Sequence, residues 1–170
     1  MSTSYRRILV PIDGSATSTR GLDEAIGLCL ATGGSMRVLH VLDDIAFVAG
    51  FESGAAYAKE VVPRLRKRSE DILEAGRKRA QDAGVAVDAV FVECFGQRTS
   101  EIVCEQATAW KADLIVVGTH GRRGVRRMML GSEAEQIVRE APVPVLVVRA
   151  PAARPDAAAP AAKAEAAEAA

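Results

Sequence analysis

The sequence has few cysteines, few aromatic residues and no excess of either charge. Its three cysteines, Cys29, Cys94 and Cys104, lie far apart without CxxC spacing. An odd, scattered set fits neither a disulfide framework nor a zinc site, so we expect three buried thiols that act as small apolar side chains. Lysine plus arginine and aspartate plus glutamate both number 22. Because the charges balance, any anion-binding site must be local.

Long apolar runs and common catalytic motifs are also missing. The apolar run from Ile8 to Ile12 ends at Asp13, which is too short for a signal-peptide core or a membrane span, so we expect a cytoplasmic protein. No GxSxG, HExxH or Cys–His nucleophile pattern occurs, and neither His40 nor His120 has a metal-binding partner at ligand spacing. We therefore expect no covalent catalysis and no metal held by protein ligands.

Short apolar segments alternate with helical ones along most of the chain. Strands are predicted at 7–11, 36–42, 85–94, 113–117 and 143–148, and helices after residue 15 and at 59–83, 100–110 and 132–140. Such alternation predicts an α/β domain over residues 1–150, with an open, doubly wound, five-stranded parallel sheet and helices on both faces. Residues 151–170, rich in alanine and proline, are predicted to be a disordered tail.

In sheets of this kind ligands bind at the carboxyl ends of the strands, where the strand order reverses. The candidate loops follow Pro11, Leu42 and Val117. The second loop contains Phe47, Phe51 and Tyr57. These aromatic side chains either close over a ligand or pack against the long helix that follows.

The third loop, GTHGRRGVRRMMLGS from Gly118 to Ser132, combines glycines with four arginines and no acid. Glycines permit close backbone approach, and a helix start at Ser132 adds unpaired amides and a positive dipole end, so the loop favours an anion such as phosphate. The alternative is a tight surface loop with solvated arginines. Ser132 and Glu135 also form an S-x-x-E capping box. The spacing is neither a P-loop nor a GxGxxG pattern.

Gly118-x2-Gly121-x9-Gly131-Ser132 matches the G-x2-G-x9-G-[ST] motif of ATP-binding universal stress proteins. RILVPIDGS near the start and the strand containing LHV resemble the same family, so the resemblance covers about residues 5–149. It implies a Rossmann-like fold of the adenine nucleotide-binding type. The residues that it implies as ligand contacts are Asp13 at the ribose, Pro11 and Val41 at the adenine, Gly118 near the sugar, and Gly121, Gly131 and Ser132 at the phosphates. Glu133 departs from the apolar residue found in family ATP binders, although its contact there is through the backbone.

Three functions follow from these observations. The chain binds ATP as a regulator in stress response, with Mg²⁺ held through the phosphates; or it is a slow ATPase; or it is an interaction protein without nucleotide. We favour the first. The last predicted strand, Val143 to Val148, falls at a sheet edge with little charge, which predicts a homodimer through that strand, as the resemblance also implies. The basic run from Arg64 to Arg68 has acids four residues on, which favours a solvated, ion-paired helix face over a nucleic-acid site.

Overall fold

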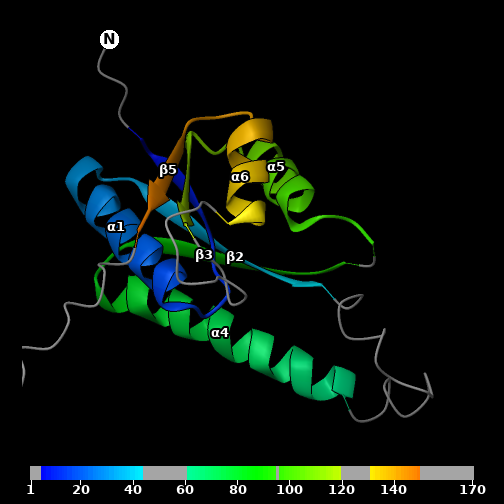
Figure 1. Ribbon diagram of the computed structural model, residues 1–170. Coiled ribbons are helices and arrows are strands. Elements are labelled where there is room, and N and C mark those ends of the chain that lie inside the picture. The colour runs from blue at the N-terminus through cyan, green and yellow to red at the C-terminus, as the bar shows by residue number, and fades with distance from the viewer. Residues whose placement is uncertain (1–4, 44–60, 95, 120–130, 150–170) are drawn as a thin grey trace, which may run out of the picture.

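The computed structural model describes residues 5–43, 61–94, 96–119 and 131–149 of the chain. Five strands alternate with helices in these ranges (Figure 1). In chain order the elements are β1 (Arg7–Pro11), α1 (Ala16–Thr32), β2 (Ser35–Asp43), α4 (Val62–Asp82), β3 (Ala86–Cys94), α5 (Thr99–Ala109), β4 (Leu114–Gly118), α6 (Ser132–Glu140) and β5 (Val145–Val148). Neighbouring strands pair in parallel in the order β3-β2-β1-β4-β5, which confirms the predicted fold class.

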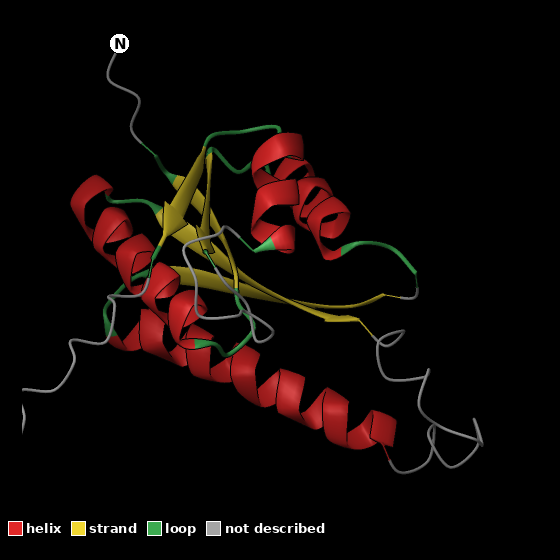
Figure 2. Cartoon of the chain, viewed as in Figure 1, coloured by secondary structure: helices red, strands yellow, loops and turns green. Residues whose placement is uncertain are grey.

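Helices cover both faces of the sheet, as Figure 2 shows. Apolar side chains of α1 and α4 pack with Ile8, Val10 and Val38 on one face. Side chains of α5 and α6 pack with Leu9, Leu39 and other strand residues on the opposite face. The central strands are thus apolar on both sides because helices bury both faces, as in other parallel sheets.

The strand order reverses between β1 and β4. From β1 the chain moves outward to β2 and β3, and then returns to β4 on the other side of β1. The segments that leave β1 and β4 therefore start side by side at the carboxyl edge, where ligands bind in open α/β sheets. Two of the three predicted loops start at this reversal.

Several element boundaries differ from the predicted ones. The strand expected at Val143–Val148 begins at Val145, because Pro144 has no N–H and takes part only through its carbonyl, which accepts a hydrogen bond from the Ile115 amide at 3.0 Å. The helix expected from residue 59 begins at Val62, with Pro63 in its first turn. Residues 59 and 60 lie outside the described ranges, as does the predicted tail.

The basic run in α4 has ion pairs, as expected, although not all with the expected partner. Lys67 lies 3.5 Å from Asp71 on the same helix. Arg66 instead reaches across to β3, where its guanidinium donates two hydrogen bonds of 2.7 Å to Glu93. Since β3 lies beneath α4, tertiary packing gives Arg66 a partner that helical spacing could not indicate.

The cysteines only partly follow the expectation that all three are buried. Cys29 and Cys94 are buried, but Cys104 on α5 is partly exposed. Burial, with a smaller contribution from Asp113, raises the pKa of the Cys29 thiol to about 11, and burial and Glu140 also raise the pKa of Cys104. Both thiols therefore stay protonated near neutral pH, which disfavours thiolate chemistry. Within the described ranges, no helix combines the length and apolarity needed to cross a membrane.

Gly118 allows an unusually close contact between β4 and α1. A Cβ placed on Gly118 would lie 2.8 Å from the Thr17 carbonyl carbon and 2.9 Å from the Ser18 amide nitrogen. These are backbone atoms of a helix and cannot move aside singly. The contact fixes the start of α1 against the end of β4, and with it the two segments that meet at the strand-order reversal.

We expect Gly118→Ala to lower the free energy of unfolding by about 1–3 kcal/mol, because the added methyl group overpacks this contact. Gly27→Ala is the matched control, since a Cβ at Gly27 in the middle of α1 meets nothing within 4 Å. That change should raise stability by about 0.5–1 kcal/mol through helix propensity. Urea unfolding of the two variants checks both signs; equal behaviour would contradict the packing account.

Candidate functional site

The turn between β1 and α1 is held by hydrogen bonds of its own side chains. Asp13 Oδ1 accepts a hydrogen bond from the Ser15 amide at 2.9 Å, and the Asp13 amide lies 3.4 Å from Ser18 Oγ. Gly14 has φ of +79°, a conformation that costs glycine little. The carboxylate of Asp13 is therefore fixed in direction at the end of β1, while the side chain is only half-buried.

Ser15 caps the first helix. It is the N-cap of α1, and its Oγ accepts a hydrogen bond from the Ser18 amide at 3.2 Å. Asp13 lies two residues before this cap, and its carboxylate accepts a hydrogen bond from the Ser15 amide within the turn. Ser15 is thus the N-cap, and Asp13 stabilises the turn that precedes the helix.

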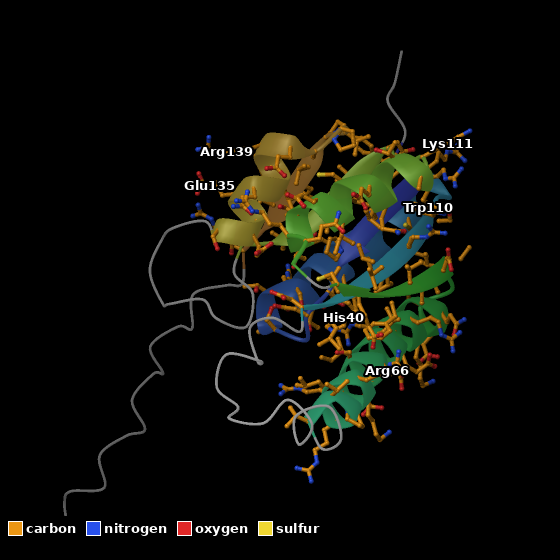
Figure 3. All side chains as sticks on the ribbon, turned by 90° about the vertical axis from the view of Figure 1, so that its right-hand side faces the viewer. His40, Arg66, Trp110, Lys111, Glu135 and Arg139 are labelled. Carbon is orange, nitrogen blue, oxygen red and sulfur yellow. The ribbon has the colours of Figure 1, made fainter. Side chains whose placement is uncertain are left out.

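Residues of α4 and β2 pack against this turn. A Cβ on Gly14 would lie 3.0 Å from Ile72 Cδ1, and one on Gly76 of α4 would lie 2.6 Å from Ile12 Cδ1. From β2, His40 Nδ1 lies 2.6 Å from the Ile12 carbonyl oxygen. Figure 3 shows His40 between the sheet and α4. Contacts from α4 and β2 therefore hold the turn in place.

The two ends of the glycine-rich segment meet beside this turn. The Thr119 amide donates to the Val148 carbonyl at 2.9 Å, and the Thr119 carbonyl accepts from the Gly131 amide at 2.8 Å. Thr119 is buried. Because Gly118 and Gly131 are linked through Thr119, the first and last glycines of the motif lie together at the carboxyl edge, next to the start of α1.

The helix start after Gly131 differs from the predicted capping box. The N-cap of α6 is Gly131, without a side-chain hydrogen bond, and Ser132 is already the first helical residue. The Gly131 amide is hydrogen-bonded to the Thr119 carbonyl, and Gly131 takes the N-cap position. The helix therefore begins at Ser132, one residue earlier than it would if Ser132 were the N-cap. Glu135, the expected partner of Ser132, instead binds Arg139 at 2.8 Å. Ser132 and Glu133 are exposed in the first turn, where amides lack helical acceptors.

Pro11 and Val41 share one face of the sheet near the same edge. Pro11 pairs with Leu39, and Val41 pairs with Val92. Alternation along the strands places them on the face covered by α5 and α6, and both remain half-buried. They present apolar surface beside Asp13, which suits the flat face of a nucleobase.

Several predicted features lie outside the described residues. These are Gly121, His120, the four arginines of the glycine-rich segment, and Phe47, Phe51 and Tyr57. The structure brings together the other seven predicted site residues at the carboxyl edge: Pro11, Asp13, Val41, Gly118, Gly131, Ser132 and Glu133. Sequence reasoning missed Thr119 and Ser18, because a single hydroxyl residue gives no signal of its tertiary partner. Nowhere in the described ranges do three histidine, cysteine or acidic residues form a metal-binding group.

The chain is similar to known proteins along most of its length. The model of the Universal stress protein family matches residues 4–149. A universal stress protein of Methanocaldococcus jannaschii is 34% identical over 147 residues, which covers 86% of this chain and 84% of the relative.

Two solved structures extend the comparison to the fold. The hypothetical protein MJ0577 is 24% identical with a TM-score of 0.76, over 87% of this chain and 98% of its own. A universal stress protein in complex with cAMP is 25% identical with a TM-score of 0.59, over 86% of this chain and 98% of its own.

Two serine variants test where the helices are capped. Ser15→Ala should lower the free energy of unfolding by about 1 kcal/mol, because it removes the acceptor for the Ser18 amide. Ser132→Ala should change it by less than about 0.5 kcal/mol, since Ser132 caps nothing. Denaturant unfolding measures both changes. A large loss of unfolding free energy in Ser132→Ala would show that Ser132 does cap α6, as the sequence predicted.

Proposed function

The chain belongs to the universal stress protein family, and on that premise we propose that it binds ATP with Mg²⁺ at the carboxyl edge of the sheet and acts as a nucleotide-dependent regulator in stress response. The observation that carries the proposal is the junction of Gly118, Thr119 and Gly131 beside the Asp13 turn. It sets the start of α6 next to the reversal of strand order, where backbone amides and the helix dipole favour phosphate.

Each part of a nucleotide has a matching group at this edge. The half-buried Pro11 and Val41 offer apolar surface to the base, and the oriented Asp13 carboxylate suits ribose hydroxyl groups. Gly131, Ser132 and the first-turn amides of α6 suit phosphates, because no side chain caps that turn at Gly131. Gly118 supports the site by allowing α1 to approach. Glu133 is exposed in the first turn of α6, and its contact with a phosphate would be through its backbone amide. By motif position, Gly121 joins the phosphate contacts.

The choice of an adenine nucleotide is supported by the relative in complex with cAMP, which is 25% identical. Mg²⁺ is proposed to bind through the phosphates, since Asp13 is already engaged with the Ser15 amide and a phosphate-bound magnesium ion needs few protein ligands.

A regulatory role is favoured over turnover by the state of His40 beside the turn and of two thiols elsewhere in the fold. His40 is buried and its Nδ1 is bound to the Ile12 carbonyl, so that nitrogen cannot activate water. The raised pKa values of Cys29 and Cys104 disfavour thiolate nucleophiles. A slow ATPase is the second candidate, and phosphate release separates the two. The free cysteines also suit a reducing compartment, and we place the protein in the cytoplasm.

We further propose a homodimer through β5. This strand lies at an edge of the sheet. Within one chain Val145 and Val147 are only partly buried, and Leu146 is exposed. A two-fold axis would pair β5 with its own copy in antiparallel register and satisfy both edges. With Pro144 outside the strand, the residues available for pairing are Val145–Val148, fewer than the sequence indicated.

The nucleotide site is tested by calorimetry with Mg²⁺ and ATP or GTP. We expect saturable binding of ATP, weaker binding of GTP, and about tenfold lower ATP affinity in Ser132→Ala, because a hydrogen bond to a charged phosphate is lost from a residue that caps nothing. Absence of any ATP binding at millimolar concentration, or wild-type affinity in Ser132→Ala, would contradict the assignment. Steady phosphate release by the wild type that is lost in Ser132→Ala would favour the ATPase.

The dimer is tested by sedimentation at micromolar concentration. Leu146 is 38% exposed in a single chain, so Leu146→Lys should leave the protomer folded and yet shift the dimer to monomer, because it places a charge in the paired edge. Ala86→Lys, on the exposed start of the opposite edge strand β3, is the control and should stay dimeric. A monomeric wild type, or a dimeric Leu146→Lys, would overturn the interface.

A further inference from the structure

His40 is a buried polar side chain in an otherwise apolar layer. Only 3% of it is exposed, and it lies on the face of β2 that also carries Met36 and Val38 of the core under α1 and α4. Its ring stacks on Phe91 of β3, with centroids 6.2 Å apart and an interplanar angle of 13°. A buried imidazole is costly unless its nitrogens find partners, so the partner of Nδ1 indicates what the residue does.

That partner is the carbonyl oxygen of Ile12, at 2.6 Å. A carbonyl oxygen can only accept, so Nδ1 carries the hydrogen and donates it. The acceptor lies one residue beyond the end of β1, while the Ile12 amide continues the pairing by donating to the Leu39 carbonyl at 2.8 Å. A side chain of β2 thus supplies a donor just where the strand gives way to the turn.

The peptide unit that joins Ile12 to Asp13 is consequently held at both ends. Its carbonyl accepts from His40, and its amide N–H points to Ser18 Oγ at 3.4 Å. The plane of this peptide unit sets the direction in which the Asp13 side chain leaves the backbone. Asp13 Oδ1 then accepts the Ser15 amide. The contacts form one chain from β2 through the peptide to the carboxylate.

We propose that His40 is a positioning residue for the nucleotide site: its Nδ1–H orients the Ile12–Asp13 peptide unit and thereby aims the Asp13 carboxylate. The inference rests on the proposed nucleotide function for its effect on affinity. The effect of His40 on the conformation of the turn does not depend on that proposed function. His40 itself touches no ligand in this assignment.

Two substitutions separate the hydrogen bond from packing. His40→Leu keeps an apolar side chain of similar bulk under α4 but removes the donor and leaves the buried Ile12 carbonyl without it. His40→Asn loses the ring and its stacking on Phe91, but its side-chain amide can donate from nearly the same place as Nδ1. A role confined to packing predicts that leucine is the milder change, and a positioning role predicts the reverse.

Each variant is measured by calorimetry with Mg²⁺ and ATP and by amide hydrogen exchange in the protein without ligand. For His40→Leu we expect about tenfold weaker ATP binding and faster exchange of the Asp13, Ser15 and Ser18 amides. For His40→Asn we expect affinity within about twofold of the wild type and slow exchange at the same amides, even if its melting temperature falls.

Met36→Ala is the control for general loss of stability. Met36 is fully buried on the same face of β2, four residues before His40, and pairs with Ile8 far from the turn. It should lower the melting temperature without changing ATP affinity or exchange in the turn. The inference is overturned if His40→Leu matches the wild type, or if His40→Asn loses as much affinity and protection as His40→Leu. If the wild type binds no ATP, the proposed function fails, and exchange in the turn alone decides the role of His40.

Discussion

The close approach of α1 to the end of β4 at Gly118 is the contact on which the candidate site depends. With backbone atoms of Thr17 and Ser18 less than 3 Å from where a Cβ would stand, no other residue fits without moving the helix. The contact brings the β1–α1 turn against the exit of β4. Thr119 and Gly131 then continue from that exit into α6. A single missing side chain thus sets the distance between the two halves of the site.

The second support comes from the opposite direction, through α4 and β2. Ile72 and Gly76 of α4 pack against Gly14 and Ile12, and His40 reaches the same segment from β2. The turn is held by side chains from two elements that are distant in sequence. A turn fixed in this way presents its carboxylate with little entropy left to lose on binding, which is the usual benefit of preorganisation.

Much of the fold was predictable because its causes are local or periodic. Buried parallel strands appear in the sequence as apolar runs, and helices appear as apolar residues that repeat about every 3.6 positions. Gly33 ends α1 in the left-handed conformation that is common for a glycine just after a helix. The capping of α6, the start of β5 and the partner of Arg66 were predicted wrongly. Each depends on a contact from another element: Thr119 with Gly131, Ile115 with Pro144, and Glu93 with Arg66. Predictions from residue spacing consider only residues close together in the chain, so they cannot identify a partner that comes from another element.

The sequence by itself determined the α/β class, the three candidate loops and the chemistry of the residues in them, because composition and spacing fix which groups stand at strand ends. Only the tertiary structure decided that Gly118 is a packing residue as well as a motif residue, that Ser132 is exposed without capping, and that His40 donates to the carbonyl before Asp13. These properties are distances between segments far apart in the chain. They exist only once the sheet has brought β1, β2 and β4 side by side.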